Sequence, residues 1–382
     1  MPDVLICGDT LRSPEMRHEV PLGIGDPFLY LESDGRRAVL TNVLEVDRIA
    51  QQAPDLERLL GEQFGRDELI AEGLSYEEVD RALYVRAVNH FGITTAVVPP
   101  DFPLAVADRL RAEGVALSVD DDLFVERRRR KTDAELAGIR RATEAGLAGL
   151  AECARTLREA SIDGDQMRLD GELLTSEIVR ARVREVCARA GAPAPDDIIV
   201  AAMRPGDAVG HESGSGPLPA HAPICLDLWP QDEESGCWAD MTRTFVRGEI
   251  SDGIAGLHAL VLEAHERACA AVRPGVRGVD VYGVACDVFE AAGQPTQRTK
   301  KPGETLRHGF YFGLGHGVGL EVHEAPALGR TGRDPLIAGD VIAVEPGTVD
   351  PDHGGMRVED LLLVTEDGYE NLTADFPYDL TP

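Results

Sequence analysis

The first third of the chain alternates short apolar runs with helical patterns. Residues 28–32 and 38–41 are apolar runs separated by a Ser-Asp-Gly turn at 33–35, which is typical of a β-hairpin. Residues 95–119 have the pattern of strand, helix and strand, with the helical part over 104–112. Because strands that alternate with helices are typical of an α/β domain, we predict a separate domain of this class here.

A change in charge marks the end of this domain. Acidic residues 120–122 are followed by a basic run at 127–131, which we interpret as a solvated linker, and we place the domain boundary between residues 126 and 127. Thr132 and Glu135 then have the spacing of a capping box, in which each side chain satisfies a backbone N–H of the other residue. Apolar residues follow at helical spacing, so we predict that a long helix begins there.

The rest of the chain repeats one order of elements. The long helix, a helix over 177–190 and two strands form the first pass, and helices over 254–272 and 279–292 with two further strands form the second. The four strands are expected around Ile224, Phe245, Val341 and Leu361. The two passes have similar lengths, which indicates a duplicated α+β domain over 127–382.

The composition disfavours several classes of function. The chain has 382 residues, of which 43% are hydrophobic and 27% charged, as in an ordinary globular protein. Its 38 basic and 67 acidic residues give a net charge of −29, which repels nucleic acids and anionic membranes, so neither is expected as a partner. The seven cysteines include no Cys-x-x-Cys pair and are expected to be reduced. The first residues lack the pattern of a signal peptide, so we expect a cytoplasmic protein.

Carboxylates interrupt two apolar runs that we expect to form one hairpin. Asp227 lies in Ile-Cys-Leu-Asp-Leu-Trp and Asp240 lies in Ala-Asp-Met-Thr-Arg-Thr-Phe, with an acidic, glycine-containing turn between them. If the two residues pair across the hairpin, their Cβ atoms lie roughly 4.5–5.5 Å apart on one face. Two bare carboxylates repel by about 4 kcal/mol at about 4 Å and an effective dielectric of about 20. Protonation, Arg243 or a divalent cation would offset this repulsion, and an acidic turn without a metal is the alternative.

Further ionisable side chains lie in strand-like runs. His316 lies in Gly-Leu-Gly-His-Gly-Val-Gly, and His323 follows seven residues later. Glycine at every second position favours an extended strand over a dinucleotide-binding loop, which needs a strand before it, a helix after it and an acidic partner for the ribose. Glu345 in Val-Glu-Pro-Gly and Glu359 in Arg-Val-Glu-Asp lie in largely apolar runs, where burial of a carboxylate is costly unless it has a partner.

Taken in this order, these motifs closely resemble those of the pita-bread metallopeptidases. Within that family the chain is most similar to the Xaa-Pro branch, prolidase and aminopeptidase P, whose members carry a separate N-terminal α/β domain. The resemblance covers residues 130–375 strongly and 1–125 in general character. It implies an α+β fold, with a smaller creatinase-like α/β domain over 1–126. The catalytic domain over 127–382 would be a duplicated pita-bread domain with a curved antiparallel sheet.

The resemblance also implies a metal centre and a reaction. The residues that match the metal ligands of the family are Asp227, Asp240, His316, Glu345 and Glu359. Four carboxylates and one imidazole suit two divalent ions, with Mn²⁺ favoured over Co²⁺ or Zn²⁺. The implied reaction is hydrolysis of the N-terminal Xaa-Pro bond of dipeptides or short peptides by a hydroxide held between the two ions.

Residues around the metal ions receive roles in the same way. By resemblance, Glu345 shuttles the proton, whereas His211 and His323 contact the substrate and stabilise the oxyanion. His211 lies in a glycine-rich loop, where a surface histidine without a role is the alternative. Arg357 shares a strand face with Glu359 two residues later and is expected to orient a metal carboxylate. The resemblance further implies a homodimer that acts on a small peptide.

Three departures from the family pattern concern the hairpin and the substrate. Asp227 and Asp240 are two positions further apart than usual, and an even insertion keeps both residues on one face. Phe312 stands where a substrate-lining histidine is usual, and Val349 stands where an aromatic residue is usual. We expect both residues at the substrate pocket, where they weaken the case for a preference for proline.

Other readings stay open on the sequence alone. A relative with a non-proline substrate, or a metal-dependent lyase that acts on a sulfonio-propionate, would have the same metal ligands. Creatinase-like enzymes do not need all five ligands, and binding homologues without catalysis typically lose some of them. A methionine aminopeptidase would leave residues 1–125 unexplained.

Overall fold

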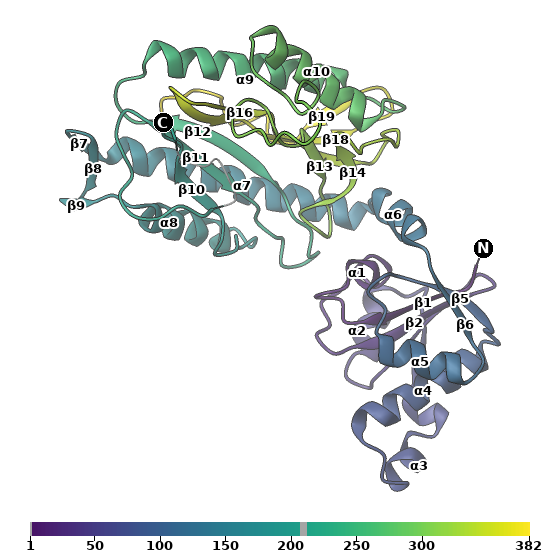
Figure 1. Ribbon diagram of the computed structural model, residues 1–382. Coiled ribbons are helices and arrows are strands. Elements are labelled where there is room, and N and C mark those ends of the chain that lie inside the picture. Colours follow the sequence, from purple (N-terminus) through teal and green to yellow (C-terminus); the bar gives the residue numbers. More distant parts are fainter. Residues whose placement is uncertain (1, 207–211) are drawn as a thin grey trace. The chain divides into compact units, whose positions relative to one another are not determined.

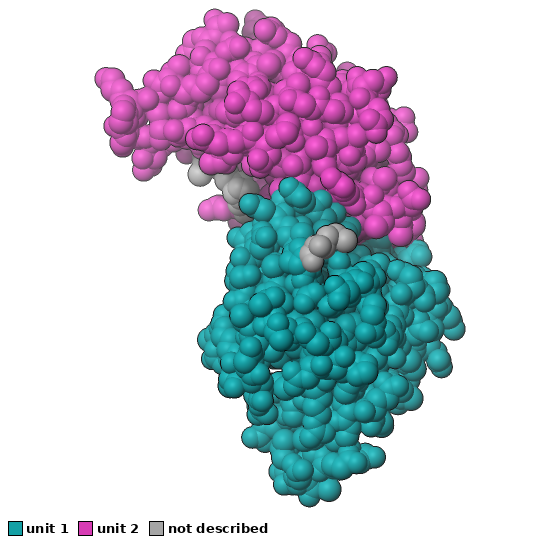
Figure 2. All heavy atoms as spheres, turned by 90° about the vertical axis from the view of Figure 1, so that its right-hand side faces the viewer, with its two compact units in different colours: residues 1–128, 234–236 teal, residues 129–233, 237–382 magenta. Residues whose placement is uncertain are grey.

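The computed structural model describes residues 2–206 and 212–382, and the chain divides into two compact units. Unit 1 comprises Met1–Arg128 with Glu234–Gly236, and unit 2 comprises Arg129–Glu233 with Cys237–Pro382, as coloured in Figure 2. The boundary that we placed between residues 126 and 127 lies inside helix α6 (Asp121–Arg129). Each helix in the described part of the chain is too short or too polar to cross a membrane.

Unit 1 is built on a six-stranded mixed sheet with the order β4-β3-β2-β1-β5-β6 (Figure 1). Its strands are β1 (Val4–Gly8), β2 (Phe28–Ser33), β3 (Arg36–Thr41), β4 (Glu57–Leu60), β5 (Thr95–Val98) and β6 (Ala116–Val119). Its helices before α6 are α1 (Pro14–Glu19), α2 (Val46–Gln52), the 3₁₀ helix η1 (Gly61–Phe64), α3 (Arg66–Ala71), α4 (Tyr76–His90) and α5 (Leu104–Ala112). The hairpin and the strand–helix–strand segment predicted from the sequence are confirmed as β2–β3 and β5–α5–β6.

Alternate residues of each strand point to opposite faces of this sheet, and each face packs against a core that includes residues of helices. Leu5 and Cys7 of β1 join a core that includes residues of α4 and α5. Val4 and Ile6 join a second core that includes residues of α1 and α2. Unit 1 is therefore a layered α/β structure, as the sequence predicts.

The basic run at 127–131 is not the solvated linker that we expected. In unit 1, Arg127 Nη1 lies 2.7 Å from Glu19 Oε1. In unit 2, Arg129 donates from Nε and Nη2 to the two carboxylate oxygens of Asp340, at 2.9 and 2.7 Å. Both acids are buried, and a buried carboxylate needs a charged or hydrogen-bonding partner, so this run supplies partners to buried acids.

The helices of unit 2 pack in pairs. They are α7 (Asp133–Glu159), α8 (Ser176–Arg189), α9 (Asp252–Ala271) and α10 (Gly278–Ala291). The predicted capping box is confirmed, since Thr132 Oγ1 accepts from Glu135 N at 3.2 Å and Glu135 Oε2 accepts from Thr132 N at 2.7 Å. Figure 1 shows strands of unit 2 lying between α7 with α8 and α9 with α10.

The strands of unit 2 form antiparallel sheets. A three-stranded sheet has the order β10-β11-β12, and a five-stranded sheet has the order β14-β13-β15-β18-β19. These strands are β10 (Ile199–Ala202), β11 (Pro223–Leu228), β12 (Met241–Val246), β13 (Gly315–Gly317), β14 (Glu324–Leu328), β15 (Val341–Val344), β18 (Asp360–Val364) and β19 (Tyr369–Asn371). Smaller sheets are made by β7 (Ser161–Asp163), β8 (Gln166–Leu169) and β9 (Glu172–Leu173), and by β16 (Gly347–Asp350) with β17 (Gly354–Arg357).

The order of two helices followed by strands occurs twice in unit 2, as the sequence predicts. The helices α7 and α8 and the sheet of β11 and β12 contribute to one core, and α9, α10 and β15 contribute to a second. The opposite face of β15 is also buried, because Val341 and Ala343 belong to the first core, so both halves of unit 2 share this apolar packing.

Candidate metal centre

Side chains from widely separated segments meet in one cavity of about 300 Å³ in unit 2. The five residues predicted as metal ligands all line it: Asp227 in β11, Asp240 before β12, His316 in β13, Glu345 after β15 and Glu359 before β18. Ligand atoms of three of them at a time, such as Asp227, Asp240 and Glu359, lie within 4.8 Å of one another. A second such group consists of His316, Glu345 and Glu359.

The hairpin of β11 and β12 places its two carboxylates diagonally. Asp227 lies opposite Thr242, so the direct pairing of Asp227 with Asp240 that we considered does not occur, and the register differs from it by two residues. Since Asp240 is two positions before Thr242, it is on the face of the hairpin that Asp227 occupies. Diagonal neighbours are within reach of each other's side chains, and the expectation of a shared face is correct.

Glu359 links the two halves of unit 2. Its backbone N–H donates to the carbonyl oxygen of Thr242 at 3.1 Å, and Thr242 Oγ1 donates to its Oε2 at 2.6 Å. The carboxylate is thereby held beside those of the hairpin. Thr242 has a positioning role that we did not predict, although its place two residues after Asp240 on the same strand face was readable from the sequence.

Glycines allow the strand that carries His316 to lie against its neighbours. A Cβ atom on Gly315 would lie 1.9 Å from the carbonyl oxygen of Ala343, and one on Gly317 would lie 2.1 Å from that of Ala325. The imidazole Nδ1 lies 3.1 Å from the carbonyl oxygen of Gly317, which favours the tautomer with the proton on Nδ1. Nε2 then faces the carboxylates, 3.7 Å from Asp240 Oδ2 and 3.6 Å from Glu345 Oε1.

The cluster of buried acids shifts the pKa values of its members. Burial, together with the neighbouring carboxylates, raises the pKa values of Asp240 and Glu359 well above the ordinary range. Burial raises the pKa of Glu345 to about 7. Burial and the nearby His323 lower the pKa of His316 to about 4, so its imidazole is neutral at pH 7, the form that binds metals.

The donor set fits divalent cations. Asp240 Oδ1 is buried without a hydrogen-bond partner among the residues that the structure describes. Carboxylate oxygens crowded within a few ångströms repel one another unless protons or cations lie between them. Carboxylates with one imidazole are ligands that hard and borderline divalent ions accept. The geometry and the charge of the cluster therefore both suit a metal centre.

Arg357 brings a positive charge to the cluster. Its Nη2 donates a hydrogen bond to Asp227 Oδ2, and its Nη1 lies 3.7 Å from Glu345 Oε2. Our suggestion that Arg243 offsets the charge of the hairpin carboxylates is wrong, because Arg243 is turned to Asp360 and to backbone oxygens. A single guanidinium does not balance four ionised carboxylates, so protons or cations have to supply the remaining positive charge.

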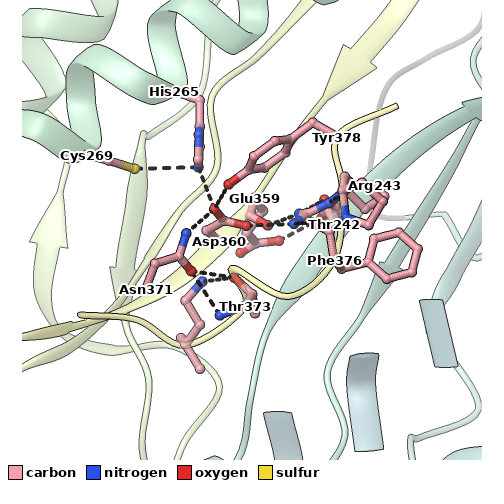
Figure 3. A network of polar contacts seen from close by, with 12 residues as sticks. Thr242, Arg243, His265, Cys269, Glu359, Asp360, Asn371, Thr373, Phe376 and Tyr378 are labelled. Carbon is pink, nitrogen blue, oxygen red and sulfur yellow. Dashed lines mark hydrogen bonds and ion pairs between the residues drawn. The ribbon is translucent and has the colours of Figure 1, made fainter. Parts of the chain in front are cut away.

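A buried polar network fixes the backbone next to Glu359 (Figure 3). Arg243 Nη1 donates to the carbonyl oxygen of Glu359 at 2.6 Å, and its Nη2 donates to Asp360 Oδ1 at 2.8 Å. The other oxygen of Asp360 accepts from Asn371 Nδ2 at 2.6 Å and from the hydroxyl of Tyr378. We did not single out Asp360. Its position directly after Glu359 in a strand was a signal, because consecutive strand residues point to opposite faces.

The remaining predicted site residues differ in position. His323 lines the cavity, and its ring lies edge-on to that of His316 with the centroids 4.2 Å apart. His211 lies outside the described residues. Phe312 packs edge-on against Phe310 at 5.3 Å between centroids, and neither it nor the buried Val349 is among the residues that line this cavity. Contact of these two residues with a substrate stays a prediction.

Three further residues line the cavity that we did not foresee, namely Asp197, Trp229 and Val322. Asp197 lies in a turn before β10 and carried no signal in the sequence. Trp229 directly follows β11, and Val322 directly precedes His323. Their neighbours in the chain marked the site, but the sequence did not indicate which flanking side chains enter the cavity.

Comparison with known proteins gives relatives over part of the sequence and over nearly the whole fold. A Xaa-Pro dipeptidase of Pyrococcus furiosus is 36% identical over 137 residues, and the match spans about a third (35%) of each chain. The crystal structure of a prolidase from Pyrococcus horikoshii has a TM-score of 0.74 at 22% identity and covers 98% of this chain and 94% of its own. An X-Pro aminopeptidase from Thermotoga maritima has a TM-score of 0.77 at 24% identity, with 98% and 96% covered.

At these identities, the likeness to solved structures concerns the fold. It confirms the predicted α+β architecture, in which a catalytic pita-bread domain follows a smaller N-terminal domain. The model of the metallopeptidase family M24 matches residues 137–366, which is more than half of the chain and includes all five clustered residues. The acidic cluster therefore lies within a region that matches a family of metallopeptidases. We conclude that the chain belongs to metallopeptidase family M24.

Proposed function

We propose that this protein is a dinuclear metallopeptidase that hydrolyses the N-terminal Xaa-Pro bond of dipeptides or short peptides. The observation that carries the proposal is the meeting of Asp227, Asp240, His316, Glu345 and Glu359 in one cavity. These residues come from five places along some 130 positions of sequence. Burying so many acids together opposes folding, so hydrophobic packing does not account for their arrangement, whereas a metal centre does.

In this proposal, the five clustered residues would hold two divalent ions. When bound, such ions supply an activated water as the nucleophile and polarise the scissile carbonyl. The ligand set is rich in carboxylate oxygen and has a single imidazole, which supports Mn²⁺ over ions that prefer thiolate. Thr242 donates a hydrogen bond to Oε2 of Glu359, and Arg243 donates one to the backbone carbonyl oxygen of the same residue, so both help to position it.

The chain's own groups account for the transfer of protons and the stabilisation of charge. Glu345, whose pKa burial raises to about 7, is suited to accept and release a proton near neutral pH. His323 is exposed to the cavity and can donate a hydrogen bond to the oxyanion that develops on the substrate. Arg357 keeps the carboxylate of Asp227 oriented by their hydrogen bond.

The choice of Xaa-Pro peptides is supported by the relatives, among which are a Xaa-Pro dipeptidase, a prolidase and an X-Pro aminopeptidase. A chemical argument points the same way. Proline in a peptide has no N–H, so an enzyme that must bind this group cannot use such a substrate. A site that acts on the carbonyl group does not need that N–H.

The test combines metal analysis with hydrolysis of Gly-Pro and of a longer Xaa-Pro peptide, with and without added Mn²⁺. We expect two ions per chain in the wild type and loss of both metal and activity in Asp240→Asn. The exposed Asp352→Asn serves as the matched control and should keep both. Full metal content and activity in Asp240→Asn would overturn the proposal. Bound metal without cleavage of either peptide would indicate that the enzyme acts on another substrate, such as the sulfonio-propionate of the metal-dependent lyase.

Two finer parts of the proposal have their own outcomes. Hydrolysis of both peptide lengths would assign the aminopeptidase P type, and hydrolysis of the dipeptide alone would assign the prolidase type. The resemblance to this branch also implies a homodimer, so light scattering should give about twice the chain mass of 41.2 kDa. A mass near that of one chain would exclude the dimer.

A further inference from the structure

Three residues line the cavity without being among the predicted metal ligands or their partners. Asp197, Trp229 and Val322 share its wall with the carboxylate cluster. The strands β10 and β11 are antiparallel, with Ile199 opposite Asp227. Asp197 is two residues before the start of β10, and Trp229 directly follows the end of β11, so the two lie at the same end of this strand pair.

The backbone of Asp197 is anchored while its side chain is exposed. Its carbonyl oxygen accepts a hydrogen bond from Ser213 Oγ at 3.0 Å, and Ile199 two residues later belongs to the sheet. Across residues 2–206 and 212–382, no lysine or arginine forms an ion pair with the Asp197 carboxylate. A fixed negative charge is therefore available on the cavity wall.

Trp229 supplies an aromatic surface on the wall of the same cavity. The residue is half-buried, and it packs against the core formed by α7, α8 and the first sheet, so its ring is held in place. The face of a tryptophan ring attracts an ammonium or guanidinium group within about 6 Å. Val322 adds an apolar surface of the kind on which the methylene chain of lysine or arginine packs.

We propose that Asp197 and Trp229 bind the basic side chain of the first residue of the substrate, so that peptides beginning with lysine or arginine are preferred. The proposal rests on the proposed function and specifies its substrate class. The α-ammonium group is attached next to the scissile carbonyl and so must lie near the metal cluster. Among the described residues, Asp197 belongs to none of the groups of three possible metal ligands whose atoms lie within 4.8 Å of one another. We therefore assign it to a cation further along the substrate side chain.

The charge of the whole chain acts in the same direction. A net charge of −29 creates a field that attracts cationic peptides and raises their concentration near the protein. This long-range effect depends on the sum of charges, whereas the site effect depends on one carboxylate. Variants that change the total charge equally at different places therefore separate the two.

The test compares kcat/KM for two Xaa-Pro peptides that differ only in the first residue, lysine or norleucine, which has a similar chain without the ammonium group. We expect a preference for lysine of about tenfold, the combined size of an exposed ion pair and a cation–π contact. Asp197→Asn should bring the ratio close to one. Trp229→Leu should lower it, and Trp229→Phe should retain part of it because the ring is kept.

Asp196→Asn is the matched control. Asp196 is the exposed neighbour of Asp197, has the same charge and is not among the residues that line the cavity. It should leave the ratio unchanged. The proposal is overturned if the wild type does not discriminate between the peptides, if Asp196→Asn reduces the ratio as much as Asp197→Asn, or if Asp197→Asn slows both peptides equally. The last result would assign Asp197 to a feature common to all substrates, such as the α-ammonium.

A binding measurement separates this proposal from the proposed function. If neither peptide is cleaved, the proposed peptidase activity is contradicted. Calorimetry can still compare the affinities of lysinamide and norleucinamide for the site of Asp197 and Trp229. Tighter binding of lysinamide to the wild type, lost in Asp197→Asn and kept in Asp196→Asn, would support the site alone. Equal binding of the two amides would overturn it.

Discussion

Raising the pH of the metal-free protein should destabilise unit 2. Burial raises the pKa of Glu345 from 4.5 to about 7, so its carboxyl stays protonated in the folded chain at pH values where the unfolded chain is ionised. The folded state binds the extra proton, and its stability falls wherever that state binds more protons than the unfolded one. The contribution of Glu345 is therefore fully present below about pH 4.5 and is lost as the pH rises through about 7.

The size of this effect follows from the width of the interval. One proton of difference changes the free energy of unfolding by about 1.4 kcal/mol per pH unit. Over the interval from 4.5 to about 7, Glu345 alone accounts for about 3 kcal/mol. Asp240 and Glu359 act in the same direction, because burial also raises their pKa values. For a domain of this size, about 3 kcal/mol corresponds to a shift in Tm of roughly 6–12 °C.

Calorimetry of chelator-treated protein between pH 5 and 7.5, at constant ionic strength, measures this loss. Glu345→Gln is the matched variant, since its amide does not titrate, and its Tm should depend less on pH than that of the wild type. With saturating Mn²⁺ the trend should weaken or reverse, because metal binding needs deprotonated ligands and becomes stronger as the pH rises. Equal pH dependence of Tm in the metal-free wild type and Glu345→Gln would refute the reasoning.

Three substitutions test single contacts. Thr242→Val removes the hydrogen bond to Glu359 Oε2, worth about 1.5–3 kcal/mol for a charged acceptor, so Mn²⁺ affinity measured by calorimetry should fall at least tenfold; an unchanged affinity would show that the carboxylate is held without it. Thr132→Ala removes the cap of α7 and should cost about 1 kcal/mol in urea unfolding with kcat unchanged, whereas a loss of kcat alone would contradict a purely structural role. Gly317→Ala places a Cβ 2.1 Å from the carbonyl oxygen of Ala325, so β13 must shift and metal content should fall; full metal content at unchanged Tm would show that the strand tolerates the methyl group.

The sequence indicated the clustered residues because each breaks a local rule. Asp227 and Glu345 are carboxylates in or beside strands that are otherwise apolar, and such a position is unfavourable without a partner. Local signals also predicted the start of α7, since a capping box depends on residues only three positions apart. These features need no knowledge of what lies across the fold.

Long-range contacts explain what the sequence did not reveal. The register of β11 with β12 places Thr242, and not Asp240, opposite Asp227, and a shift of two residues leaves the pattern of faces unchanged. Likewise, a basic run has the same composition whether it is solvated or paired, and Arg129 finds Asp340 more than 200 positions away. The sequence carries the charges of such pairs but not the information on which of them meet.

The charge balance of the cluster connects its stability to its proposed chemistry. Four carboxylates lie around Arg357, whose guanidinium bonds Asp227, and the burial of Asp240 and Glu359 shifts their pKa values toward the protonated form. Packing alone would favour fewer acids here, since burying each one opposes folding. The network of Arg243 and Asp360 nevertheless holds the backbone of Glu359 in place, so the chain fixes an acid where its negative charge is unfavourable. Bound protons or cations reduce the electrostatic repulsion among these carboxylates, and a divalent ion reduces it more than a proton does. The repulsion lowers the stability of the metal-free protein, and its removal on binding adds to the affinity for metal.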